Sequence, residues 1–92
     1  MLRIMFTSTA VWGLKLHNIS EDMAMYVVQK GKHEVLRKRA PDEENEQDEI
    51  KTCRSRLNGL MVEYDFNNSK QMATVRCVNL DYALDPNYVP WL

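Results

Sequence analysis

Histidine and cysteine, the side chains that most often act as catalytic bases, nucleophiles or metal ligands, each occur twice in this sequence. His17 and His33 have no nucleophile or carboxylate at a spacing typical of a catalytic pair. Cys53 and Cys77 fit no zinc-binding spacing, either with each other or with the histidines. The sequence also contains no glycine-rich phosphate-binding loop. It therefore predicts no catalytic residues, no metal site and no cofactor, and we expect a protein that is not an enzyme.

An abrupt change of charge is the feature that most indicates binding, and it reads RKRAPDEENEQDE from Arg37 to Glu49. Three consecutive basic residues are followed, after Ala40 and Pro41, by six acids in eight positions. Adjacent blocks of opposite sign are self-complementary about a two-fold axis, so two copies of the chain could pair through them. The predicted partner-binding residues in this stretch are Arg37, Lys38, Arg39, Glu43, Glu44 and Glu46. The alternative is that both blocks are solvated and partly neutralise each other across Pro41.

The basic residues in segment 30–39 raise a second alternative, which is contact with the phosphates of a nucleic acid. The whole chain argues against it, because its net charge is −1, with twelve basic and thirteen acidic side chains. Arg37, Lys38 and Arg39 cannot all point the same way in an extended chain, and the neighbouring acids would repel a polyanion. Protein binding is therefore the leading prediction, as an inhibitor or adaptor that forms a homodimer, and nucleic-acid binding is the alternative.

The C-terminal segment 81–92, DYALDPNYVPWL, combines two prolines with three aromatic residues and predicts no regular element. Tyr88 and Trp91 could dock into a groove on a partner, since tyrosine and tryptophan often dominate the energy of an interface. The alternative is that this segment folds back over the protein's own core, where buried aromatic rings also contribute strongly.

The N-terminal half of the chain predicts a mixture of strands and helices. Alternating apolar residues in LRIMFT predict a strand over 2–7, whereas 8–18 fits either a short strand or a helical turn. A helix is predicted over 20–31, because Ser20 is a favourable N-cap and Gly31 fits a left-handed position just past the end. A hairpin turning at Lys30 and Gly31 is the alternative, and 33–39 is either a strand or an extension of the helix.

A second helix is predicted over 42–57, with acidic first turns and basic residues in its last turn, as the helix dipole favours. Ile50, Cys53 and Leu57 form an apolar stripe at helical spacing, and Asn58-Gly59 is interpreted as a stop signal. The acidic half has no apolar face, so we expect it to project into water or against a partner.

A β-hairpin over 60–79 is the clearest element, because two alternating runs flank the turn-rich segment 67–70. Pairing Phe66 with Gln71 gathers the apolar residues on one face, and a slip of one residue would destroy this sorting. The predicted inner face consists of Leu60, Val62, Tyr64, Phe66, Ala73, Val75 and Cys77.

Together these elements predict an α+β fold, with a small mostly antiparallel sheet and one or two helices packed on one face. A chain of 92 residues fits a single domain over 1–92, with a possible docking tail at 81–92. No stretch is long enough to cross a membrane, and two cysteines suit free thiols in a reducing compartment. We therefore expect a cytoplasmic protein that binds another protein and no membrane.

Overall fold

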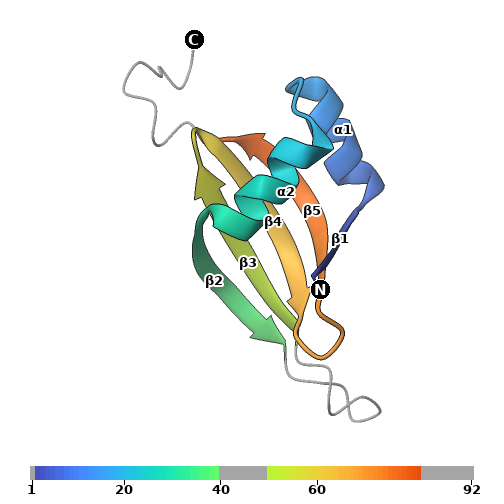
Figure 1. Cartoon of the computed structure of the whole chain (residues 1–92), viewed down its shortest axis with the longest axis vertical. Helices are drawn as coiled ribbons and strands as arrows, with labels where there is room; N and C mark the ends of the chain where they lie inside the picture. The colour runs from blue at the N-terminus through green and yellow to red at the C-terminus, as the bar shows by residue number, and fades with distance from the viewer. Residues whose placement is uncertain (1, 40–49, 82–92) are drawn as a thin grey trace.

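The protein consists of a five-stranded sheet and two helices in a computed structural model that describes residues 2–39 and 50–81 (Figure 1). Along the chain the elements are β1 (Arg3–Phe6), α1 (Ser8–Leu16), α2 (Glu21–Lys30), β2 (Lys32–Arg39), β3 (Ile50–Leu57), β4 (Leu60–Asn67) and β5 (Met72–Leu80). The strand order in the sheet is β1-β5-β4-β3-β2. Strands β2 to β5 form an antiparallel meander, and β1 pairs with β5 in parallel. The predicted fold class is confirmed.

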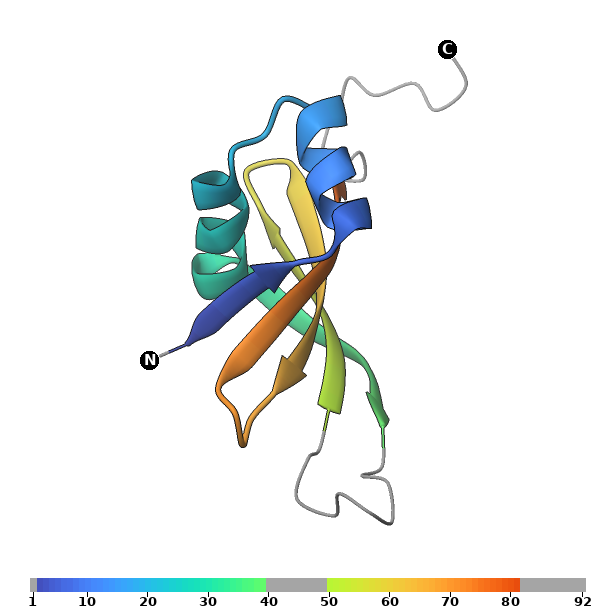
Figure 2. The same ribbon diagram turned by 90° about the vertical axis from the view of Figure 1, so that its right-hand side faces the viewer.

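The two helices cover different parts of the sheet. Helix α2 lies across β3 and β4 on one face, while α1 packs along the part of β5 that extends beyond the end of β1 (Figure 2). Both helices begin at a side-chain cap, because the Thr7 hydroxyl accepts from the Ala10 N–H and the Ser20 hydroxyl from the Met23 N–H. The predicted helix after Ser20 is thus confirmed. The ambiguous segments resolve as helix for α1 and strand for β2.

Gly31 ends α2, but the reason predicted for it is wrong. Its φ is −74°, so the position needs no left-handed conformation. Space is the constraint instead: a Cβ at this position would lie 2.8 Å from the Arg56 carbonyl oxygen and would collide with the Ser55 hydroxyl. A glycine is therefore needed where the chain passes close to β3 on its way from α2 into β2.

The predicted helix over 42–57 is wrong in its described part, because residues Ile50–Leu57 form β3. The apolar spacing that fits a helix is also compatible with a strand, in which Cys53 and Ser55 are buried and Arg54 between them is not. Asn58 and Gly59 have φ of 53° and 79°. Positive φ at both positions is the signature of a two-residue hairpin turn, so the dipeptide reverses the chain between β3 and β4 instead of stopping a helix. Residues 42–49 lie outside the described part.

The hairpin formed by β4 and β5 is confirmed, but its predicted register is wrong. Phe66 lies opposite Ala73 instead of Gln71, because 68–71 form the turn and Asn67 accepts hydrogen bonds from Ser69 and Lys70 within it. A two-residue shift keeps every side chain on its face, so apolar sorting alone could not detect the error. A bulge next to Arg76 then moves Cys77 opposite Glu63 and puts Val78 on the inner face in its place.

A single core lies between the sheet and the helices. Its buried members are Ala10, Leu14, Ala24, Val27, Val28, Cys53, Val62, Tyr64, Ala73, Val75 and Val78. One buried polar contact ties the layers together, since the Ser55 hydroxyl donates to the Val27 carbonyl oxygen at 2.6 Å. Neither helix in the described ranges has the length and apolar character needed to span a membrane.

Candidate functional site

Strand β2 forms one edge of the sheet and is the most exposed element of the protein. One side of the strand pairs with β3, and the other pairs with no strand in the described part of the chain. All its described side chains, Lys32 to Lys38, are exposed, including the apolar Val35 (52%) and Leu36 (41%). An open edge carries a row of backbone N–H and C=O groups that another chain can pair with.

The charges of β2 determine which chains could pair with it. The strand carries four basic residues against one acid, Glu34. Glu34 is already engaged by Arg54 at 3.3 Å and by Arg56 at 3.8 Å, so it does not neutralise its own strand. Lys38 lies directly opposite Lys51 of β3, and neither lysine forms an ion pair within the described residues. Like charges placed opposite each other are destabilising, and an acidic neighbour would relieve them.

A bulge interrupts the pairing of β2 with β3 between Val35 and Arg37, with Leu36 as the extra residue. Bulges and charged side chains are the usual means by which natural proteins prevent an edge strand from pairing with a copy of itself. Both are present here, and the charges of β2 disfavour a second basic strand but not an acidic segment.

The predicted basic residues thus occupy a strand, not the approach to a helix. Arg37 lies opposite Thr52, Lys38 opposite Lys51, and Arg39 opposite Ile50. The other predicted partner-binding residues, Glu43, Glu44, Glu46, Tyr88 and Trp91, lie outside the described part of the chain. The role of all eight in binding stays a prediction.

The outer face of the sheet, opposite α2, carries a network of ion pairs. Arg54 bridges Glu34 and Glu63, with its closest approach to Glu63 at 2.7 Å. Thr52 donates a hydrogen bond to Asp65 at 2.8 Å, and Arg76 approaches the same carboxylate at 3.4 Å. A groove of about 430 Å³ crosses this face from Arg37 to Thr7 and Thr9, the residues at the start of α1. Two of the charged groups that line this groove are already paired, Arg76 with Asp65 and Glu63 with Arg54.

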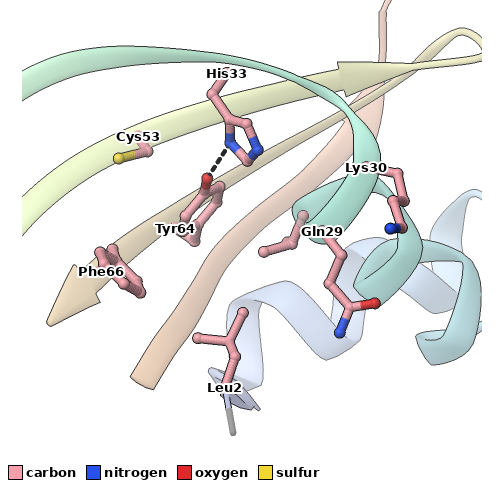
Figure 3. Close-up of a pocket in the computed structure, with 8 residues that line it drawn as sticks. Leu2, Gln29, Lys30, His33, Cys53, Tyr64 and Phe66 are labelled. Atoms are coloured by element: carbon pink, nitrogen blue, oxygen red, sulfur yellow. Dashed lines mark hydrogen bonds between the residues drawn. The ribbon is translucent and has the colours of Figure 1, made fainter. Parts of the chain in front are cut away.

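A pocket of about 520 Å³ opens on the other side of the sheet, beside the C-terminal end of α2 (Figure 3). Its floor is apolar and comes from the sheet and α2: Leu2, Val28, Cys53, Tyr64 and Phe66. Its rim is polar and exposed: Gln29, Lys30 and His33. Figure 3 shows the three rim side chains along one side of the pocket and Leu2 and Phe66 on the other. Lys30 is the only charged residue that lines it within the described chain.

A hydrogen bond between His33 and Tyr64 joins the rim of this pocket to its floor. The Tyr64 hydroxyl oxygen lies 2.5 Å from Nδ1 of His33, and the two rings meet edge to face. Tyr64 is only 4% exposed, and this burial raises its pKa to about 12. The phenol therefore keeps its proton at neutral pH, so the hydroxyl can donate to Nδ1 of His33. When Nδ1 accepts in this way, the ring presents Nε2–H as a donor.

The two cysteines are unsuited to nucleophilic chemistry. Both are free thiols, and burial raises the pKa of Cys53 and of Cys77. Cys53 lies in the core as predicted, but Cys77 does not, because the bulge in β5 turns it onto the outer face. Among residues 2–39 and 50–81, no three His, Cys, Asp or Glu side chains cluster closely enough to hold a metal ion.

No pattern in the sequence indicates the pocket, because its lining comes from Leu2, which precedes β1, and from α2, β2, β3 and β4, and these residues share no spacing. His33 is exposed, and only the pairing of β2, β3 and β4 brings it over Tyr64. Comparison with known proteins adds no further assignment: no protein-family model, curated protein or solved structure matches this chain.

Proposed function

We propose that this protein is a non-enzymatic binding module that takes an extended acidic segment of another protein as an additional strand along β2. The observation that carries the proposal is an eight-residue edge strand with exposed Val35 and Leu36 and an excess of basic residues. In strand addition, main-chain hydrogen bonds supply affinity and alternate side chains supply specificity. An acidic segment would also reduce the electrostatic repulsion between Lys38 and Lys51, which lie opposite each other.

A second copy of this chain is the first partner to consider, because its segment 42–49 holds six acids. The basic residues of β2 and the acids that follow them in the sequence are adjacent blocks of opposite sign, and such blocks are self-complementary about a two-fold axis. We therefore propose a homodimer in which each acidic segment lies on the partner's β2.

A direct pairing of two β2 strands is a less favourable dimer. It would place four basic residues of one strand beside four of the other, and like charges placed opposite each other are destabilising. Nucleic-acid binding is also disfavoured, because consecutive basic side chains of β2 alternate between two faces. Two free thiols support a reducing, cytoplasmic location.

Sedimentation velocity at low and high salt tests the dimer. We expect a dimer at low salt that weakens as salt rises, since screening reduces contacts between exposed charges. Arg37→Glu with Lys38→Glu should abolish it, and adding Glu43→Lys, Glu44→Lys and Glu46→Lys to the same chain should restore it. The matched control, Arg3→Glu with Lys15→Glu, reverses two exposed charges away from β2 and should leave the dimer unchanged. A wild-type monomer at low salt and high concentration would refute self-association.

Hydrogen–deuterium exchange separates strand addition from a purely electrostatic encounter. At a concentration that supports the dimer, amides of β2 should exchange more slowly than in the monomeric Arg37→Glu, Lys38→Glu variant. Equal exchange in the two would exclude an added strand. Binding of duplex or single-stranded DNA is measured in parallel by fluorescence anisotropy, and micromolar affinity with a steep salt dependence would favour the nucleic-acid alternative instead.

A further inference from the structure

We propose that the pocket beside the end of α2 binds a small amphipathic monocarboxylate, a molecule with one carboxylate and an apolar body. This second site is independent of the proposed strand addition at β2. The volume of about 520 Å³ lies within the range of pockets that hold small molecules. Its lining separates into an apolar floor and a polar rim, which is the pattern that an amphipathic molecule requires.

The floor is built to receive an apolar body. Val28, Cys53 and Tyr64 are 3%, 7% and 4% exposed, so they belong to the core and hold the base of the pocket rigid. Leu2 and Phe66 are only partly buried and pack against that core from the opposite side. Their remaining apolar surface faces the pocket, and covering it with a hydrocarbon group is favourable in proportion to the area removed from water.

The rim is built to receive one negative charge. The Lys30 ammonium is the only charged group that lines the pocket in the described chain, and no acid accompanies it there. A cation is therefore disfavoured, and a doubly charged phosphate would find only one positive partner among the described residues. A single carboxylate matches the charge.

The hydrogen-bond donors of the rim also suit a carboxylate. The Tyr64 hydroxyl is 2.5 Å from Nδ1 of His33, and when the hydroxyl donates to that nitrogen the ring presents Nε2–H to the pocket as a donor. The Gln29 amide and the Lys30 ammonium supply further N–H groups along the same side (Figure 3). A carboxylate can accept from several donors at once, whereas an alcohol of the same length cannot compensate the charge of Lys30.

NMR titration of the full-length ¹⁵N-labelled protein with octanoate tests the proposal, with octan-1-ol and acetate as reference ligands. We expect saturable shifts of amides near Gln29, His33, Cys53 and Phe66 with octanoate. Octan-1-ol, which has the body without the charge, should bind at least fivefold more weakly, and acetate should show no saturable binding. The proposal is overturned if octan-1-ol binds as tightly as octanoate, or if octanoate shifts no pocket amides.

Two pairs of variants assign the binding to this pocket. Leu2→Trp should fill the cavity and weaken octanoate binding at least tenfold, whereas Met5→Trp, at an exposed position of β1, should not affect it. Lys30→Met should remove most of the preference for octanoate over octan-1-ol, whereas Lys15→Met on α1 should retain it. Because both Leu2 and Lys30 lie at the ends of their elements, unfolding is checked from the dispersion of the same spectra. Unchanged octanoate affinity in a folded Leu2→Trp protein would place the ligand elsewhere and reject the assignment.

Discussion

The two faces of the sheet are stabilised by different interactions. On the side of α2, Val62 and Val75 are completely buried and Tyr64 nearly so. On the outer face, partly exposed arginines and acids form ion pairs such as Arg54 with Glu63. Burial contributes kilocalories per side chain, whereas partly exposed ion pairs contribute about 0–1 kcal/mol each. The outer face and the edge at β2 can therefore change their chemistry for binding while the residues buried on the helix side stabilise the fold.

The largest expected effect comes from placing a charge on the helix side. Val75→Asp should destabilise the protein by about 3–5 kcal/mol, because it buries an unpaired carboxylate where the wild-type side chain is fully enclosed. Chemical denaturation monitored by circular dichroism measures the change. Met5→Asp, which adds the same charge at an exposed position on β1, should stay within about 0.5 kcal/mol of wild type. Similar stability of the two variants would contradict the contrast between the faces.

The next largest effect is a loss of stability at high pH caused by Tyr64. The ordinary pKa of a tyrosine is 10.0, and burial raises that of Tyr64 to about 12. Below pH 10 the phenol is protonated in both states; between pH 10 and 12 the unfolded chain loses the proton first. The free energy of unfolding should therefore fall by about 2–3 kcal/mol across that interval. Urea denaturation of wild type and Tyr64→Phe as a function of pH isolates this contribution, and parallel curves for the two would exclude it.

A smaller effect should follow from disturbing α1. A Cβ at Gly13 would lie 2.7 Å from the Val78 carbonyl oxygen, a backbone atom that cannot move aside freely. Gly13→Ala should therefore cost about 1–3 kcal/mol by overpacking, measured by thermal denaturation. The comparison variant is Gly59→Ala, where a Cβ meets no atom but φ is +79°. It should cost about 1 kcal/mol through backbone conformation alone. A more stable Gly13→Ala than Gly59→Ala would show that α1 is not closely packed on β5.

The smallest effect is expected on the outer face. Arg54→Met removes contacts to Glu34 and Glu63 but keeps most of the side chain's hydrocarbon volume. The loss should be about 0.2–1 kcal/mol and should shrink in high salt, because the arginine side chain is 27% exposed. Denaturant titrations at two salt concentrations measure it. A loss above about 2 kcal/mol would mean that the outer face supports the fold as strongly as the helix side does.

The sequence predicts best where local chemistry has one structural solution. Ser20 is a favourable N-cap, and α2 begins directly after it. Apolar residues alternate around Val62 and Val75, so only one face of each strand can be buried, and the two strands pair as a hairpin. Prediction fails where a pattern has two solutions. The spacing of Ile50, Cys53 and Leu57 suits a helix as well as a strand. Asn58-Gly59 can likewise end a helix or form the turn between two strands. Tertiary pairing of β3 with both β2 and β4 decides between them.

The candidate sites were less predictable than the fold. The charges of Arg37, Lys38 and Arg39 are visible in the sequence, but their exposure on an edge strand follows only from the strand order. The pocket depends on contacts between residues as distant as Leu2 and Phe66, which no local pattern encodes. Register caused the remaining error, because a shift of two residues leaves the apolar sorting of β4 and β5 intact.

The pairing of β1 with β5 has a consequence for the order in which the chain can fold. Arg3 lies opposite Met72, so β1 cannot pair until a strand about seventy residues later in the sequence is available. The hairpins of β2 to β5 close short loops and can form early, whereas closing the long loop to β1 costs more entropy and comes late. During synthesis on the ribosome, Ile4 and Phe6 therefore lack the strand that pairs with β1 until residues 72–75 have emerged. We expect β1 to dock in the last step of folding and the edge of β5 to be the surface most open to misassembly until then.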